Sequence, residues 1–292
     1  MSEQRLGILG GMGPQATQDF YQRILDRTDA SCDQEHLPTL IWSDTSMPDR
    51  TAAILGGDAE GCYRRLLDGA RLLERGGCTA LAIPCNTSHY FADRLQGDIA
   101  IPLIHMPRET VAVLAADGKK RVGILATDGT VQTGIYQREC AARGIEAVAP
   151  PADVQKLVMS IIYDEIKRGE KGSREKFAAI DRWLRGSGCD AAILGCTELS
   201  VYRTYHGLPD YYLDAMEILA ERCITACGYK LRMVWGEQRV VWAPAPMFTP
   251  RKSDTVGAET SPPLCLCTTG PRRGRCPHRP ARSAFPKMID WW

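Results

Sequence analysis

Short apolar runs alternate along this chain with longer segments in which apolar residues recur every three or four positions. The run at residues 5–10 is typical of a short buried strand, and the runs at 37–42 and 80–83 predict two further strands. The segments at 16–28 and 58–75 have the spacing of amphipathic helices, and glycines bound several of these stretches. This order predicts strand–loop–helix units in the first part of the chain.

The same alternation starts again near residue 101. The runs at 122–125 and 191–194 predict two further strands. The helices of this part are expected at residues 107–116, 131–143, 153–168, 173–185 and 212–227. Short apolar strands that alternate with helices favour parallel sheets covered by helices on both faces, so the predicted fold class is α/β.

Two motifs occur twice, which indicates an internal duplication. The tripeptide at residues 7–9, Gly-Ile-Leu, returns at residues 123–125. The apolar strand that ends at Cys85 has a counterpart in the strand that ends at Cys196. We therefore predict two similar lobes, each of which places one thiol at an equivalent position.

The predicted domain organisation has three parts. The first lobe comprises residues 1–102 and 206–230, and the second lobe comprises residues 103–205. Residues 231–292 depart from the pattern, because they hold nine of the 18 prolines and four of the six tryptophans with almost no periodic apolar spacing. We expect this last part to be an irregular, Pro- and Arg-rich tail.

Composition and charge narrow the possible partners. The formal net charge is +1 and basic residues are scattered through most of the chain, so nucleic acid is not favoured as a partner. The N-terminus runs directly into an apolar strand without a signal-peptide core, and no apolar stretch is long enough to span a bilayer. We expect a cytoplasmic protein without a membrane partner.

The chain contains 12 cysteines, most of them single and within apolar runs, as buried reduced thiols are. A thiol redox protein would favour close pairs such as C-x-x-C, which the two lobes lack. In the tail, Cys265, Cys267, Cys276 and His278 would suffice for a zinc site, but their spacing differs from the usual C-x2-C arrangement. Accidental clustering is therefore favoured, and no metal is expected.

The predicted strand ends indicate where chemistry would occur. Ligands bind at the carboxyl ends of strands in parallel sheets, and Gly11, Cys85, Thr127 and Cys196 all lie at such ends. If the two lobes face each other, the two thiols lie on opposite walls of one cleft. The N-terminus of a following helix lowers the pKa of a cysteine from about 8.5 toward neutrality and can hold a carboxylate. The pattern therefore predicts a pair of acid/base groups on either side of a small molecule.

Four motifs together resemble the aspartate/glutamate racemase superfamily, and within it the aspartate racemase branch. They lie at residues 10–14 (GGMGP), 47–50 (MPDR), 84–89 (PCNTSH) and 195–199 (GCTEL), and the resemblance extends over about residues 5–228. It implies two pseudo-symmetric flavodoxin-like lobes with the active site at their interface. It also implies an enzyme that needs neither pyridoxal phosphate nor a metal, hence no cofactor, and that forms a homodimer.

The resemblance further implies residue roles. One of Cys85 and Cys196 removes the α-proton as a thiolate, the other returns a proton to the opposite face as a thiol, and the roles exchange for the other enantiomer. Hydroxyl and amide donors would meet the α-carboxylate, and Arg50 and Lys167 would bind the distal carboxylate of an acidic amino acid. The expected substrate-binding residues are Met12, Arg50, Asn86, Thr87, Thr127, Thr130, Lys167 and Thr197.

Several assignments stay open at this point. Arg50 and Lys167 could instead be solvated side chains, and Arg168 competes with its neighbour as the second cation. His89 could tune the Cys85 thiol or only cap or pack, and Glu198 could orient a hydroxyl or cap a helix.

The predicted function is that of an isomerase that interconverts L- and D-aspartate with two thiols. A mixed aspartate/glutamate racemase is the alternative, since one methylene changes binding by only about 1–3 kcal/mol. A non-catalytic amino-acid-binding relic of the same fold is a further alternative. Loss of one cysteine or of the carboxylate donors would be typical of such a relic, and neither has been lost.

Overall fold

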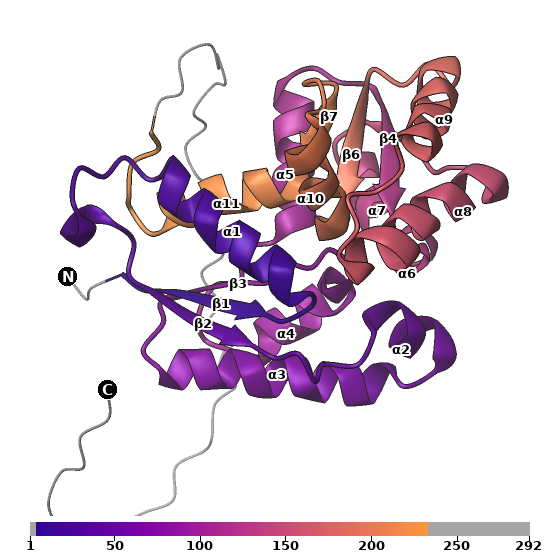
Figure 1. Ribbon diagram of the computed structural model, residues 1–292. Coiled ribbons are helices and arrows are strands. Elements are labelled where there is room, and N and C mark those ends of the chain that lie inside the picture. The colour runs from indigo at the N-terminus through magenta and orange to yellow at the C-terminus, as the bar shows by residue number, and fades with distance from the viewer. Residues whose placement is uncertain (1–3, 233–292) are drawn as a thin grey trace, which may run out of the picture. The chain divides into compact units, whose positions relative to one another are not determined.

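A computed structural model describes residues 4–232 and shows two parallel β-sheets with helices around them (Figure 1). The strands are β1 (Leu6–Gly10), β2 (Thr39–Ser43), β3 (Ala80–Ala82), β4 (Arg121–Ala126), β5 (Glu146–Val148), β6 (Ala191–Gly195) and β7 (Tyr212–Asp214). Their order is β2-β1-β3 in the first sheet and β5-β4-β6-β7 in the second, and every pairing is parallel. The predicted α/β class is confirmed.

The α-helices connect and cover these strands. They are α1 (Pro14–Arg27), α2 (Arg50–Gly56), α3 (Ala59–Arg75), α4 (Ala92–Asp98), α5 (Met106–Ala116), α6 (Asp128–Gln132), α7 (Ile135–Ala141), α8 (Ala152–Ser160), α9 (Arg174–Gly186), α10 (Thr197–His206) and α11 (Ala215–Ala226). Short helical turns of other types are η1 (Asp33–Glu35), η2 (Thr87–Phe91), η3 (Ile161–Glu165) and η4 (Ile166–Arg168).

Alternate residues of each central strand enter different cores, as the pleat of a strand buried on both faces requires. Leu9 of β1 packs with residues of α3 and α4, whereas Leu6 and Ile8 pack on the opposite face. In the second sheet, Leu125 of β4 packs with residues of α8 and α9. Ile124 joins the same core as Leu6 and Ile8. The middle core, filled by α1, α5 and α11, is therefore shared by both sheets.

The two sheets repeat the same arrangement. β1 lies between β2 and β3 as β4 lies between β5 and β6, so the strands before Cys85 and Cys196 occupy equivalent positions. A parallel bridge from Leu81 to Leu103 lies beside β3 where β7 lies beside β6. The duplication read from the sequence is therefore present in the topology.

The boundary expected near residue 206 differs from the structure. The apolar pattern predicts one helix of the first lobe over residues 212–227, but residues 212–214 form β7, which pairs with β6 of the second sheet. Only α11 returns to pack against α1. Because the two buried apolar residues of β7, Tyr212 and Leu213, fit either a helix or a strand, the pattern alone does not separate the two elements.

Two other expected helices are interrupted. The segment 131–143 is divided into α6 and α7 at Gly134, whose φ of +68° is left-handed. The segment 153–168 is regular only to Ser160 and then continues as η3 and η4 up to Gly169, which has a φ of +86°. Glycine takes such angles without the steric cost that a Cβ imposes.

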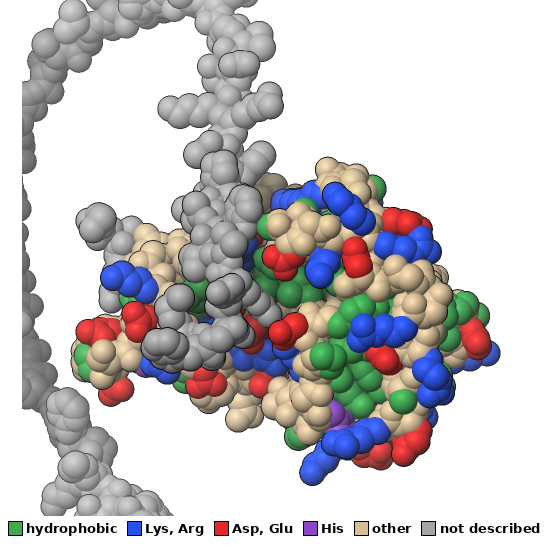
Figure 2. All heavy atoms as spheres, turned by 90° about the horizontal axis from the view of Figure 1, so that it is seen from above, with side chains coloured by type: hydrophobic (Ala, Val, Ile, Leu, Met, Phe, Trp, Pro, Cys, Tyr) green, Lys and Arg blue, Asp and Glu red, His purple; other side chains and the backbone are tan. Residues whose placement is uncertain are grey.

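The expected tail falls almost entirely outside the described residues, including the four residues considered for zinc. Leu231 and Arg232 are described, and they pair with Thr28 and Arg27 beside the end of α1. Among residues 4–232 no helix has both the length and the apolar character needed to cross a membrane. On the face seen in Figure 2, basic and acidic side chains are interspersed rather than gathered in one patch.

Candidate active site

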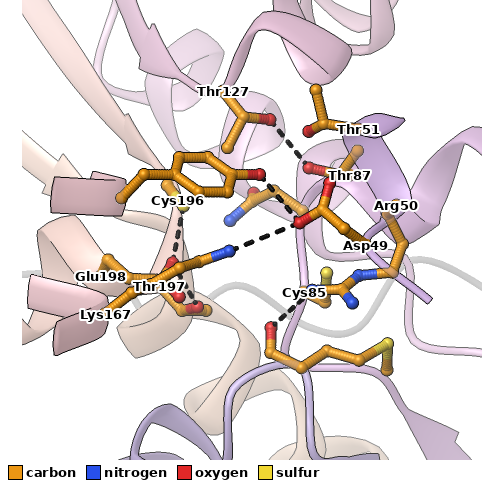
Figure 3. A pocket seen from close by; sticks show the side chains of 13 residues that line it. Asp49, Arg50, Thr51, Cys85, Thr87, Thr127, Lys167, Cys196, Thr197 and Glu198 are labelled. Carbon is orange, nitrogen blue, oxygen red and sulfur yellow. Dashed lines mark hydrogen bonds and ion pairs between the residues drawn. The ribbon is translucent and has the colours of Figure 1, made fainter. Parts of the chain in front are cut away.

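The carboxyl ends of β1, β3, β4 and β6 meet around one pocket, as parallel sheets place their loops on the same edge. The space among its lining residues that no protein atom fills is about 270 Å³, and part of that space is open to solvent. Both lobes contribute, with Cys85 and Arg50 on one side and Cys196 and Glu198 on the other (Figure 3). The lining residues are Met12, Asp49, Arg50, Thr51, Cys85, Asn86, Thr87, Thr127, Tyr163, Lys167, Cys196, Thr197 and Glu198.

Cys196 is buried at the N-cap position of α10. Its thiol donates a hydrogen bond of 2.7 Å to the Glu198 carboxylate, which also accepts one of 3.3 Å from the Thr197 hydroxyl. Burial, and then the negative charge of Glu198, raise the pKa of Cys196 well above its ordinary value. Cys196 is therefore held as a protonated thiol, and Glu198 orients it rather than capping the helix.

Cys85 has a cation as its neighbour instead of a carboxylate. Arg50, the first residue of α2, donates to the carbonyl groups of Pro48 at 2.8 Å and Met12 at 3.3 Å. Burial opposes the charge of Arg50, but the negative forms of Cys85 and Asp49 raise the pKa of this guanidinium. Nε of Arg50 is buried and has no hydrogen-bond partner among the described residues. The Arg50 charge thus lies where a Cys85 thiolate would need it.

A cluster of hydroxyl groups joins the two lobes beside the thiols. The Thr87 hydroxyl lies 2.9 Å from those of both Thr127 and Thr130, and the latter two are 3.2 Å apart. Thr87 and Thr127 line the pocket, whereas Thr130 lies behind them and supports them. Asn86 accepts from Tyr136 through Oδ1, and its buried Nδ2 has no partner in the described part of the chain.

Lys167 takes part in a contact across the lobes. Its Nζ lies 3.7 Å from Asp49 Oδ2 and 3.9 Å from the centroid of the Tyr163 ring. The Tyr163 hydroxyl donates a hydrogen bond of 3.0 Å to the same carboxylate. Burial opposes its charge, but Glu198 and Cys196 raise the pKa of Lys167. Arg168 does not line the pocket, and its side chain is 70% exposed. The structure therefore selects Lys167 as the second cation of the pocket.

Three lining residues are not among the expected site residues: Asp49, Thr51 and Tyr163. Asp49 and Thr51 are the chain neighbours of Arg50, so their positions beside an expected site residue could have indicated them. Tyr163 lies four residues before Lys167, which places it one helical turn away. An aromatic residue at that spacing is common in buried helices, and for this reason nothing in the sequence marks Tyr163 as a site residue.

His89 lies outside the pocket and holds the loop that carries Cys85. Its Nδ1 donates to the Cys85 carbonyl at 2.9 Å, and its Nε2 accepts from the Met106 amide at 3.1 Å. Burial lowers the pKa of His89 to about 3, so the ring stays neutral, as these two bonds require. His89 therefore positions the backbone of Cys85.

Within the described residues, no group of three or more His, Cys, Asp or Glu side chains is arranged to hold a metal ion.

Comparison with known proteins matches the same part of the chain. The family model described as Asp/Glu/Hydantoin racemase matches residues 9–223. The structure of Picrophilus torridus aspartate racemase superposes with a TM-score of 0.68 and 30% identity, covering 78% of this chain and 96% of that one. An aspartate racemase homologue from Pyrococcus horikoshii OT3 shares the fold, with a TM-score of 0.62, 22% identity, and coverage of 77% and 99%.

A sequence relative agrees with this assignment. The broad specificity amino-acid racemase RacX of Bacillus subtilis is 32% identical over 147 residues, which is 49% of this chain and 63% of that protein. The chain thus matches less than two thirds of the length of this curated relative. Since the family model spans both thiol-bearing strands, and the structure brings those strands to one pocket, the chain belongs to the Asp/Glu/Hydantoin racemase family.

Proposed function

We propose that this member of an amino-acid racemase family interconverts L- and D-aspartate without a cofactor, with Cys85 and Cys196 as its two acid/base groups. The observation that carries the proposal is that both thiols line one pocket from different lobes. The reaction needs one thiol that can lose its proton and one that carries a proton, and the surroundings of the two thiols differ accordingly. Cys85 has the Arg50 guanidinium beside it, and Cys196 holds its proton toward Glu198.

The proposed reaction begins with Cys85 as a thiolate. Its sulfur takes the α-proton and becomes a thiol, while the electron pair of the broken C–H bond passes to the α-carbon and its carboxylate. Cys196 then gives its S–H proton to the opposite face and becomes a thiolate. The positive charge of Lys167 partly offsets the repulsion between that thiolate and Glu198. The opposite enantiomer reacts with the two roles exchanged.

The α-carboxylate gains negative charge in the intermediate and needs hydrogen-bond donors that are already in place. Nδ2 of Asn86, which has no partner among residues 4–232, and the hydroxyls of Thr87 and Thr127 would supply them along the pocket wall, whereas the Thr197 hydroxyl already donates to Glu198. Because these groups are held by the folded protein, they would not need to reorganise during proton transfer.

The distal carboxylate of aspartate would bind Arg50 and Lys167. Nε of Arg50 is a buried donor that has no partner in the described part of the chain, and a planar guanidinium suits a carboxylate. Lys167 already contacts Asp49, so the substrate would share or replace that contact.

A mixed or broad specificity is the second candidate, and one observation favours it. A larger adjoining hollow, whose empty space of about 1040 Å³ includes open solvent, shares Met12, Asp49, Arg50, Lys167 and Glu198 with the pocket. It offers room for side chains longer than that of aspartate. The name of the Bacillus subtilis relative agrees with this alternative.

Circular dichroism of L- and D-Asp, Glu and Ala with the whole chain, without added pyridoxal phosphate, tests the proposal. We expect the dichroic signal of aspartate to decay to zero and deuterium to enter at Cα in heavy water. Cys85→Ala and Cys196→Ala should each abolish both changes. Full activity in either variant would refute the two-thiol mechanism, and binding of aspartate without turnover in the unmodified protein would favour the relic.

A further inference from the structure

Gly129 of α6 is a point of very close contact between the lobes. A Cβ added to this residue would lie 2.9 Å from Oγ1 and 3.0 Å from Cα of Thr51, and 3.1 Å from Cγ2 of Thr87. Ordinary contacts of a Cβ begin at about 3.4 Å. Since Cα of Thr51 belongs to the backbone, a side chain at position 129 could not be accommodated by rotamer changes alone.

Both neighbours of Gly129 carry groups of the pocket. Thr51 lines the pocket and directly follows Arg50 in α2. Thr87 lines it too, and its hydroxyl bonds that of Thr127, which lies two residues before Gly129 and caps α6. The contact therefore fixes α2 and η2 of the first lobe against the start of α6 in the second.

We propose that Gly129 is a positioning residue, whose missing Cβ sets the lobe separation at which Arg50 and Thr87 reach a substrate held by Thr127. This inference rests on the proposed function for its catalytic consequence. A misplacement of 1 Å can reduce a rate about 100-fold. A Cβ at residue 129 requires a shift of a few tenths of an ångström. We therefore expect about a tenfold loss of kcat/KM for Gly129→Ala.

The experiment compares Gly129→Ala with Gly97→Ala in the whole chain. Gly97 also lies in a helix, α4, but a Cβ there would meet no atom within 4 Å. The measurements are kcat and KM for L-aspartate, thermal unfolding, and amide hydrogen exchange of residues 50–56. Gly129→Ala should lower kcat, raise KM and speed exchange in α2. Its Tm should fall only slightly, because the preference of a helix for alanine over glycine, about 1 kcal/mol, offsets part of the cost of the close contact. Gly97→Ala should match the unmodified protein in kinetics and exchange.

A second background separates positioning from general damage. Thr87→Ser removes the Cγ2 that a Cβ at residue 129 would meet and keeps the hydroxyl. Gly129→Ala should therefore cost a smaller factor in kcat/KM in the Thr87→Ser background than alone. Unchanged exchange and kinetics in Gly129→Ala would overturn the inference. An equal cost in both backgrounds would overturn the part assigned to Thr87, because the closer contacts with Thr51 remain in either background. If the unmodified protein does not racemise aspartate, the proposed function fails, and the exchange rates of α2 still decide the role of Gly129.

Discussion

The two thiols of the pocket have opposite electrostatic neighbours, and this difference is set by single residues. Cys196 faces the carboxylate of Glu198, whereas Cys85 lies beside the guanidinium of Arg50. In the proposed reaction a thiolate at Cys85 would lie beside a cation, whereas a thiolate at Cys196 would lie beside a carboxylate. The two directions of racemisation would therefore begin from states of unequal free energy.

Glu198→Gln tests this asymmetry. Glu198 raises the pKa of Cys196, so removing its charge should lower that pKa. For the enantiomer whose α-proton goes to Cys196, the rising limb of the pH–rate profile should move to lower pH. Initial rates for both enantiomers against pH measure the shift, with the exposed Glu170→Gln as control. An unshifted profile would show that Glu198 does not control this thiol.

Arg50 is expected to serve both Cys85 and the distal carboxylate. A hydrogen bond to a charged group contributes about 1.5–3 kcal/mol. Arg50→Ala should therefore reduce kcat/KM for aspartate about 10- to 100-fold more than for alanine, which has no distal carboxylate. Arg50→Lys keeps the positive charge but loses the planar guanidinium, so its loss of kcat/KM for aspartate should be smaller than that of Arg50→Ala. Equal losses for aspartate and alanine would remove the proposed contact with the side-chain carboxylate.

At the scale of elements, helix boundaries place the pocket side chains. Cys196 and Thr127 are N-cap residues of α10 and α6, and Asp49 caps α2 through a bond of 2.9 Å to the Ala52 amide. Caps lie where a helix N-terminus exposes backbone N–H groups, which favours anionic ligands nearby. The pocket is therefore surrounded by helix starts from both lobes.

The break between α6 and α7 gives a prediction at this scale. Gly134 has a left-handed φ of +68°, and this conformation costs a residue with a Cβ about 1–2 kcal/mol. Gly134→Ala should lower the free energy of unfolding by about that amount, and Gly134→Asn by less. Urea unfolding measures both, with Gly186→Ala, where a Cβ has no neighbour within 4 Å, as control. A stability equal to that of the control would contradict the role of this angle.

At the scale of the whole molecule, a buried ion pair joins the two lobes. Asp214, 1% exposed at the start of α11, accepts from Arg23 of α1 at 2.7 Å and from Ser200 of α10 at 2.6 Å. Arg23 also donates a hydrogen bond of 2.9 Å to the Glu217 carboxylate. This network connects the helix that follows the glycine turn with the helix that follows Cys196.

Asp214→Ala would leave the largely buried Arg23 without its closest partner. A buried charge left with no partner costs about 3–5 kcal/mol. Arg23 keeps Glu217 and Asp19 as partners, so we expect a loss in the free energy of unfolding below that range. Urea unfolding measures it, with Asp210→Ala as control, because the Asp210 side chain is 98% exposed and lies 3.9 Å from Arg203. The control should change stability by no more than about 0.5 kcal/mol. Equal effects of the two substitutions would contradict a stabilising network.

The homodimer stays a prediction. Sedimentation velocity of the whole chain would measure its oligomeric state.

Local pattern was sufficient for much of the architecture. Apolar runs of strand length predict β1, β2, β3, β4 and β6, and the repeated motifs predict that β1 corresponds to β4 and β3 to β6. They do not predict β5, whose Glu-Ala-Val sequence is not an apolar run, or β7, whose residues continue directly into the apolar pattern of α11. Nor do they predict the break at Gly134, because an isolated glycine is tolerated within a helix.

For the site, the sequence determined which residues stand at the strand ends, including both thiols, Arg50 and the threonines, since covalent order fixes the residues that come after each strand. Tertiary structure alone decided how these residues combine. The contact of Asp49 with Tyr163 and Lys167 and the packing of Gly129 against Thr51 join segments far apart in the chain. No local pattern encodes such distances, because they depend on how the two sheets dock through the helices between them.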